Sequence, residues 1–384
     1  MRAITSPVKL VHEERRRLEN RRLIRVLGSG FMILTSVGCA LLPTSNATKQ
    51  PTILISPTTS TGSVASVQVD FTGAAELLDF FQALNQGRPW DEAAIRQMVA
   101  KPPYQMLIAH HSRMDAEVTP EALVMLLLAI RDHKPLTTVS ERLRRIHAAY
   151  QLACDQIPAL RTRLEQLRNS LPVEQAVAQA QAALPPQARI EVTVYLLLDG
   201  RSSGYVLERC IVLDLLQISS PAEVEAMLAH ELHHIGASSL LPAPCSDPCL
   251  REALEVLTGL VQEGAATYWI DNRRFSPTKS DFDQVGKFLQ DVLSGQLDAD
   301  EIKVRQAELV QGAYGPLYQV GNEVIAVLTS TKGRDWVQAR LGKPIELLRA
   351  WQEQRKAGPT FAPEVFALLD KAEALDSCPR WFRK

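Results

Sequence analysis

Apolar side chains recur at the spacing of an amphipathic helix over residues 74–99. The pair Pro102-Pro103 interrupts this run, because proline lacks the backbone N–H that a helix interior needs. Thr119 then stands where a helix N-cap is expected, with Pro120 at the first helical position. Further helices are predicted near residues 140–153, 159–170 and 173–184.

The pattern changes after Pro185-Pro186, where helical spacing gives way to alternation. Residues 189–198 alternate apolar and polar side chains, which is typical of a strand with one buried face. Residues 206–216 form a second strand-like run, and Asp199–Gly204 forms a turn or loop between the two. The chain reads as mostly helical again from Cys249 onward. These patterns predict an α+β fold that is predominantly α-helical, with a small β-sheet in the middle of the chain.

A helix start signal follows the predicted sheet. Ser220 can cap the helix, Pro221 fits its first position, and Glu223 supplies the acid of a capping box three residues after the cap. The helix that begins here must include residues 230–234, which carry the candidate chemistry.

Those residues read His230-Glu231-Leu232-His233-His234 and hold three of the eight histidines of the chain. His230 and His234 are four residues apart, so their imidazoles lie on one helix face at neighbouring turns. Neutral imidazole is a standard zinc ligand, and Glu231 can reach a zinc-bound water, as in the His-Glu-x-x-His motif of metallopeptidases. The alternative is a polar helix face with solvated histidines. His233 points to a different face, where it either supports the ligands or lies at the surface.

A catalytic zinc site needs a third protein ligand. No histidine follows His234, and Ala237 and Leu240 stand where a metzincin has glycine and histidine, so a downstream ligand must be a carboxylate. Glu263 is favoured, because it lies in the least polar part of a helix predicted over residues 250–270, where an unpaired carboxylate is costly. The alternatives are Asp247, Glu252, Glu255 and Asp271, or a surface position for Glu263 on an amphipathic helix.

Glu263-Gly264-Ala265, following the His-Glu-x-x-His motif, resembles the gluzincins, and its small side chains let a second helix approach closely. More narrowly, the chain is similar to a group of bacterial zinc-dependent peptidases in which helices come first, then a short sheet, then the motif helix. That group also has a Tyr-x-x-Gly segment, matched here by Tyr318-Gln319-Val320-Gly321. The resemblance covers residues 69–333. It implies a zincin-like metallopeptidase domain over residues 69–384, with a helical N-terminal part (69–186) and a catalytic part (187–384).

The resemblance and the residue types together imply one Zn²⁺ per chain, held by His230, His234 and Glu263. Zinc would lower the pKa of its bound water and polarise the scissile carbonyl. Glu231 would act as the general base that takes the water proton and delivers it to the leaving amine.

A further donor would stabilise the oxyanion that forms during peptide hydrolysis. Tyr318 is the first choice, followed by Tyr314 and Tyr268, and each of them is alternatively a core aromatic. The expected substrate is a peptide or protein, bound as an added strand along the sheet edge near Val206–Leu213. The run Gly200–Gly204 either shapes the rim of the cleft or is a plain turn.

Residues 1–42 are predicted to be an export signal or membrane anchor. Several arginines precede the uncharged stretch Val26–Leu42, and this positive flank is expected in the cytoplasm. Ser36-Val37-Gly38-Cys39 resembles a bacterial lipobox, with Cys39 as the lipidated residue. An uncleaved anchor and a cleaved secretion signal are the alternatives. Residues 43–68 are rich in Ser, Thr and Pro and are predicted to be a linker, so the catalytic domain would be exported and tethered to the cell-envelope membrane.

Composition adds two constraints. The 384 residues are 46% hydrophobic and carry a formal net charge of −1, which suits a globular protein and gives no indication of a nucleic-acid partner. Six cysteines are present, and export would permit a Cys245–Cys249 disulfide, with two loop thiols as the alternative. The other three are expected to be ordinary buried or free thiols: Cys154, Cys210 and Cys378.

Two rival functions remain beside a zinc peptidase. One is a non-catalytic exported protein that keeps zinc for stability or partner binding, and the other is a metal-dependent hydrolase of a non-peptide amide. Glu231 favours catalysis, because a purely structural site has no use for it. Structural zinc also usually has four protein ligands, and only three are apparent here.

Overall fold

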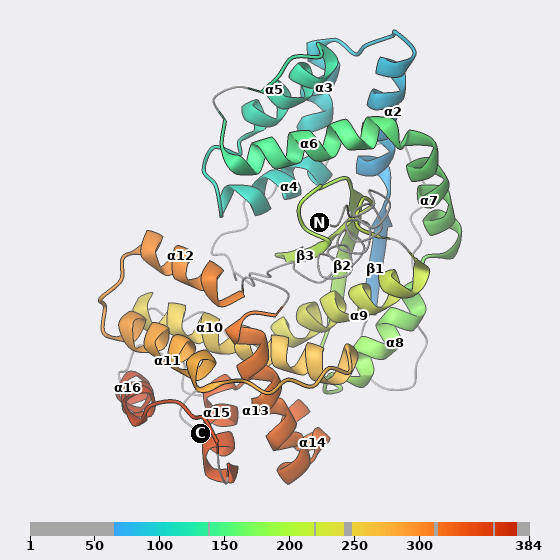
Figure 1. The fold of residues 1–384 in the computed structure, drawn as a ribbon. Helices are drawn as coiled ribbons and strands as arrows, with labels where there is room; N and C mark the ends of the chain where they lie inside the picture. The colour runs from blue at the N-terminus through green and yellow to red at the C-terminus, as the bar shows by residue number, and fades with distance from the viewer. Residues whose placement is uncertain are drawn as a thin grey trace, which may run out of the picture.

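The computed structural model describes residues 65–374 except for residues 137–138, 219, 242–247, 311–313 and 356–357. Helices dominate, and four strands form one small mixed sheet (Figure 1). The predicted α+β, predominantly helical fold class is therefore confirmed. The predicted export signal, most of the predicted linker and three of the six cysteines (Cys39, Cys245 and Cys378) lie outside the described residues.

The sheet has the strand order β1-β2-β4-β3. The strands β1 and β4 run parallel to β2, whereas β3 forms an antiparallel edge beside β4. The mixture arises because a tight turn joins β3 to β4, while helices separate β1 from β2. The strands are β1 (Ala65–Asp70), β2 (Ile190–Leu197), β3 (Gly204–Leu207) and β4 (Cys210–Asp214).

Two boundaries differ from the sequence expectation. Residues 65–68, assigned to the linker, are the first residues of β1, where Val67 pairs with Val192. The partner strand lies so far along the chain that the local Ser- and Thr-rich composition hides the strand. The run 206–216 forms part of a hairpin rather than one strand, because Glu208 adopts a left-handed conformation (φ 55°) and reverses the chain.

Between β1 and β2, two helices form where the sequence predicted one continuous apolar helical run over residues 74–99. Helices α2 (Thr72–Asn85) and α3 (Glu92–Val99) are separate, because Gly87 adopts φ +69° after the first of them. Thr119 caps α5 as predicted, with its side chain accepting from the Ala122 N–H at 3.1 Å. The remaining helices of this part are α4 (Pro102–Ser112), α5 (Pro120–Arg131), α6 (Glu141–Asp155), α7 (Ile157–Ser170) and α8 (Val173–Ala182).

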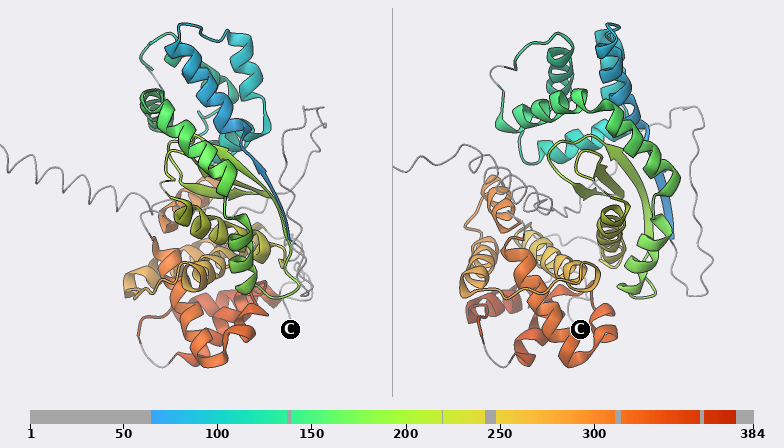
Figure 2. Two further views of the ribbon diagram at one scale, coloured as in Figure 1. Left: turned by 90° about the vertical axis from the view of Figure 1, so that its right-hand side faces the viewer. Right: turned by 45° about the vertical axis from the view of Figure 1, so that its right-hand side comes forward.

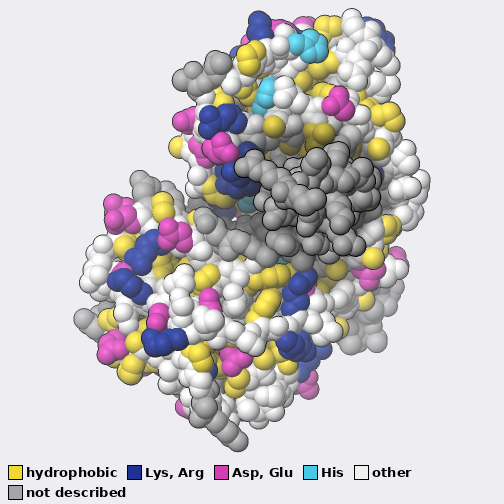
Figure 3. All heavy atoms as spheres, in the orientation of Figure 1, with side chains coloured by type: hydrophobic (Ala, Val, Ile, Leu, Met, Phe, Trp, Pro, Cys, Tyr) yellow, Lys and Arg dark blue, Asp and Glu magenta, His cyan; other side chains and the backbone are white. Residues whose placement is uncertain are grey.

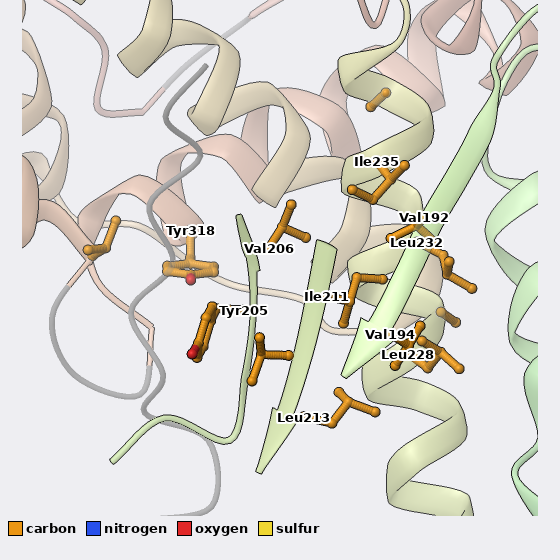
Figure 4. Packing of buried hydrophobic residues seen from close by; sticks show 14 of the residues in the cluster. Val192, Val194, Tyr205, Val206, Ile211, Leu213, Leu228, Leu232, Ile235 and Tyr318 are labelled. Atoms are coloured by element: carbon orange, nitrogen blue, oxygen red, sulfur yellow. The ribbon is translucent and has the colours of Figure 1, made fainter. Parts of the chain in front are cut away.

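The helices after the sheet lie below it in Figure 1, whereas α2 to α6 lie above it; Figure 2 shows the same order from two other sides. Leu228, Leu232 and Ile235 of α9 pack beside Val192 and Val194 of β2 (Figure 4). These later elements are α9 (Pro221–Ser238), α10 (Pro248–Ala265), the π-helix η1 (Ala266–Ile270), α11 (Lys279–Leu293), α12 (Ala299–Val310), α13 (Pro316–Lys332), α14 (Arg334–Gln338), α15 (Pro344–Gln354) and α16 (Pro363–Ala374).

The surface carries charge of both signs. On the face shown in Figure 3, Lys and Arg side chains are interspersed with Asp and Glu. Among the described helices, none combines the length and the apolar character that crossing a membrane requires.

Candidate metal centre

The helix α9 begins where the sequence predicts. Ser220 caps it by accepting from the Glu223 N–H at 3.3 Å, and Pro221 occupies its first turn. This start and the helical period place His230 and His234 on one face, with ring centroids 4.7 Å apart.

Glu263 lies near the end of α10, opposite the two histidines. Its Oε2 is 3.3 Å from Nε2 of His230 and 3.4 Å from Nε2 of His234. One donor atom from each of the three residues lies within 4.8 Å of the others. Ligand atoms at about 2.1 Å from a tetrahedral zinc are roughly 3.4 Å apart, so this cluster, called the candidate centre below, fits a zinc ion.

The other carboxylates weighed as third ligand have different places. Glu252 and Glu255 lie on α10 outside the candidate centre, and Asp247 is not among the described residues. Asp271 lies beside the opposite edge of the His230 ring, where Nδ1 is 3.2 Å from each of its carboxylate oxygens. A carboxylate at Nδ1 fixes the tautomer and the orientation of the ring, which leaves Nε2 free to face Glu263.

Asp271 reaches His230 through a change of helix type. The sequence favoured one α-helix over residues 250–270, but the chain passes from α10 into the π-helix η1 at Ala266. A π turn contains an extra residue and rotates the side chains that come after it, and such turns are frequent at functional sites. The orienting role of Asp271 therefore depends on a local geometry that apolar spacing does not reveal.

The candidate centre is buried and rich in negative charge. Glu231 is 4% exposed, and burial raises its pKa well above the ordinary value, with Glu263 and Asp271 adding to the rise against His230. Burial also opposes ionisation of Glu263, but His234 and His230 outweigh it and lower the pKa of Glu263 to about 2. The Oε2 of Glu231 has no hydrogen-bond partner in the described part of the chain. A cation held between these carboxylates would compensate their charge.

Two glycines bring α10 and α13 into backbone contact beneath Glu263. A Cβ on Gly264 would lie 2.3 Å from the backbone of Gly321, and a Cβ on Gly321 would lie 2.0 Å from the carbonyl oxygen of Leu260. The Glu-Gly-Ala and Tyr-x-x-Gly segments thus meet at one point, and the close helix approach expected at Gly264 is confirmed.

Asn322, which sequence reasoning missed, joins this contact to the chain after η1. Its Nδ2 donates to Thr267 Oγ1 at 3.1 Å and to the Arg273 carbonyl at 3.2 Å, and its Oδ1 accepts from the Phe275 N–H at 3.3 Å. Thr267 in turn donates to the Glu263 carbonyl at 2.7 Å. Its place beside Gly321 was the one available signal, because a polar residue at a close helix contact needs buried partners.

The tyrosines considered as oxyanion donors lie in α13, before it and in η1. Tyr318 is 5% exposed and packs edge-on against Tyr314, with ring centroids 5.7 Å apart. Burial raises the pKa of Tyr314 to about 12, with Arg273 lowering it and with Asp271 and Glu263 raising it. The guanidinium carbon of Arg274 lies over the ring of Tyr268, 3.7 Å from the centroid of that ring.

His233 and two cysteines complete the comparison with the sequence. His233 is fully buried, so the surface position considered for it is excluded, and neither of its ring nitrogens has a hydrogen-bond partner among the described residues. Cys154 and Cys210 are free thiols, as expected. The loop Gly200–Gly204 leads into the edge strand β3.

Comparison with known protein families identifies a match that covers most of the described chain. The family described as "Putative zinc dependent peptidase (DUF5700)" matches residues 95–357, which is more than half of the chain and includes the whole candidate centre. No curated protein and no solved structure matches the chain.

Proposed function

The chain belongs to the family described as "Putative zinc dependent peptidase", and from that premise we propose that it hydrolyses peptide bonds with a zinc ion held by His230, His234 and Glu263, as a gluzincin does. The observation that carries the proposal is the convergence of two imidazole nitrogens on one carboxylate oxygen, at 3.3 and 3.4 Å, beside the buried carboxylate of Glu231. Two histidines and one glutamate are a ligand set of catalytic zinc, and three protein ligands leave a position for water or substrate.

Bound zinc would supply a Lewis acid that polarises the scissile carbonyl and lowers the pKa of water. Glu231 is the general base in this proposal. Its buried position directly after the ligand His230 suits a carboxylate that accepts a proton from the attacking water and passes it to the leaving amine. Asp271 fixes the orientation of the His230 ring through Nδ1, so that Nε2 stays directed at the metal site.

Tyr318 is the proposed oxyanion donor, with Tyr314 as the alternative. Their edge-on contact brings both rings to the same region, and Tyr314 is within electrostatic range of Glu263. Removing a donor of this kind lowers kcat by about 10²- to 10³-fold. We expect that loss in Tyr318→Phe; a loss confined to Tyr314→Phe would reassign the role.

The proposed substrate is an extended peptide that pairs with the outer edge of β3. Among the described strands, β3 pairs with β4 alone, so the other edge of β3 has no strand partner, while β4 lies inside the sheet. The sheet edge that the sequence placed near residues 206–213 is therefore assigned here to Gly204–Leu207.

We also propose export and tethering to the membrane through residues 1–42, with Cys39 as the lipidated residue. The test is fractionation of cells that express the full chain. Cys39→Ala should lose incorporation of labelled fatty acid; unchanged labelling would contradict lipidation at this residue.

The peptidase proposal is tested with the full-length chain, zinc and an unfolded protein substrate. Wild type should hold one zinc and cleave the substrate, and Glu231→Gln should keep the zinc while hydrolysis falls by at least about 10²-fold, since general base catalysis contributes 10²–10⁴. Glu225→Gln, on the same helix, is the matched control and should stay active. Zinc binding without hydrolysis by wild type would favour a non-catalytic protein, and hydrolysis of non-peptide amides alone would favour the rival hydrolase.

A further inference from the structure

Residues 273–278, called the strap here, run from the turn at Asp271 and Asn272 to the start of α11. Asn272 adopts φ 52°, which turns the chain, and exposure then alternates residue by residue along the strap. In extended chain, side chains at i and i+2 point to the same side. Arg273 and Phe275 accordingly both face Tyr314, at 4.7 Å from guanidinium carbon to ring centroid and 4.8 Å between ring centroids.

The backbone of Arg273 is fixed on both sides. Its N–H donates to the Thr267 carbonyl at 2.9 Å, and its own carbonyl accepts from Nδ2 of Asn322 at 3.2 Å. Asn322 also accepts from the N–H of Phe275. The same segments, η1 and α13, flank Glu263, so the position of Arg273 is tied to that of the candidate centre.

Arg273 follows Asp271 by two residues, and the Asp271 carboxylate lies 3.2 Å from Nδ1 of His230. Arg273, Asp271 and Glu263 all affect the pKa of the one phenol of Tyr314, which Arg273 lowers and the two carboxylates raise. Tyr314 supports the guanidinium from one side as a stacking platform. Arg273 therefore presents a fixed positive charge next to the place where a substrate would bind.

Within the described part of the chain, that charge has no carboxylate partner. No ion pair joins Arg273 to an Asp or Glu there, and its buried Nε has no hydrogen-bond partner. The neighbouring Arg274 differs, because its Nη1 donates to the Tyr268 carbonyl at 3.0 Å and to the Arg273 carbonyl at 2.7 Å. The partly exposed guanidinium of Arg273 therefore has N–H donors to which a carboxylate of the ligand can bind.

We infer that Arg273, stacked on Tyr314, binds a carboxylate of the peptide substrate beside the candidate centre. A guanidinium matches a carboxylate with two parallel N–H···O bonds, which gives both affinity and orientation. The carboxylate is either the C-terminus of the peptide or the side chain of an Asp or Glu residue. The inference rests on the proposed peptidase function and names the substrate class for that site.

The first test measures binding to metal-free, full-length protein, so that it does not depend on catalysis. The probes are acetyl-Ala-Ala with a free C-terminus, acetyl-Ala-Ala-amide and acetyl-Glu-Ala-amide. Calorimetry measures the affinity of the protein for each probe. We expect one of the two carboxylate probes to bind at least about tenfold tighter than the neutral amide, the scale of one charged hydrogen-bond pair. The probe that binds identifies the source of the carboxylate. Equal binding of all three probes would overturn the inference.

Variants locate the effect. Arg273→Gln should abolish the preference for the carboxylate probe, whereas Arg274→Gln, the exposed neighbour, should keep it. Arg273→Lys keeps the positive charge but cannot form the two parallel N–H···O bonds of a guanidinium, so it should retain only part of the preference. This variant also tests the role of the residue if Arg273→Gln fails to fold. A full preference in Arg273→Lys and Arg273→Gln would contradict the role.

The second test uses zinc-loaded enzyme and pairs of peptides with and without the carboxylate. Arg273→Gln should raise KM for the carboxylate peptide about tenfold and leave KM for the neutral peptide unchanged. If wild type cleaves neither peptide, the peptidase proposal fails, while the binding measurements still decide the role of Arg273. If wild type cleaves both equally well, the peptidase proposal stands and the inference about Arg273 fails.

Discussion

In the described part of the chain, two buried clusters in which a histidine contacts a carboxylate are built differently. One is the candidate centre below the sheet. The other lies above it, where Nε2 of His111 is 2.9 Å from Asp199 and Nη1 of Arg142 is 2.7 Å from Nδ1 of His111. His111 and Asp199 are both fully buried.

In the upper cluster, both ring nitrogens of His111 and both carboxylate oxygens of Asp199 have hydrogen-bond partners. Asp199 uses its second oxygen to accept from the N–H groups of Arg201 and Ser202, at 2.9 and 2.8 Å. In the candidate centre, two imidazoles instead aim at one oxygen of Glu263. The hydrogen bonds of Asp199 hold in place the loop that leads into the edge strand β3. In the candidate centre, by contrast, three potential metal ligands face one another and can share one bound ion.

The largest expected effect is on zinc affinity, and it separates the two clusters. His234→Ala and Glu263→Ala each remove one of three protein ligands, so affinity should fall by roughly a thousandfold or more. His111→Ala should bind zinc as wild type does. Competition against a chromophoric chelator measures all three, and a similar loss in His111→Ala would erase the distinction.

His111→Ala should instead reduce the stability of the fold. It leaves Asp199 without its imidazole partner inside the protein, and breaking a buried pair of this kind costs about 3–5 kcal/mol. Urea unfolding of the metal-free protein gives the change in unfolding free energy. A loss under about 1 kcal/mol would show that the upper cluster contributes little.

The candidate centre, unlike the upper cluster, rests on a contact between two helix backbones. Gly264→Ala would push α10 away from Gly321, and we expect about 2–3 kcal/mol of destabilisation together with weaker zinc binding. Gly259→Ala is the matched control on the same helix. Its Cβ would meet the Leu317 side chain at 3.5 Å, an ordinary contact, so it should be neutral or slightly stabilising. Equal effects of the two substitutions would contradict the close-packing argument.

The smallest expected effect concerns the carboxylate behind the ligand. Asp271→Asn weakens the hold on Nδ1 of His230 but keeps all three ligands, so zinc affinity should fall by about 10- to 100-fold. Chelator competition again measures it. Unchanged affinity would mean that the His230 ring needs no support from Asp271.

The sequence predicted the parts of the centre that depend on local rules. The cap at Ser220 and the four-residue spacing place His230 and His234, and the cost of an unpaired carboxylate in an apolar stretch points to Glu263. It also favoured α10 with a closely packed neighbour at Gly264, since small residues permit that approach.

The remainder depends on contacts that no local pattern records. Asp271 meets His230 only because η1 departs from the α-helical period, and Asn322 finds its partners on a segment 47 to 55 residues away. The strand β1 is defined by its pairing with β2, which follows seven helices later. Such long-range pairings are set by the whole fold rather than by nearby residues.

X-ray absorption at the zinc edge tests the central claim most directly. For full-length protein loaded with one equivalent of zinc, we expect two imidazole nitrogens and oxygen ligands at about 2.0–2.2 Å, with no sulfur bound to the metal. Glu263→Ala should alter the oxygen signal, while Glu255→Ala should leave the spectrum unchanged. A sulfur shell at about 2.3 Å, or a spectrum without histidine, would contradict a zinc centre formed by His230, His234 and Glu263.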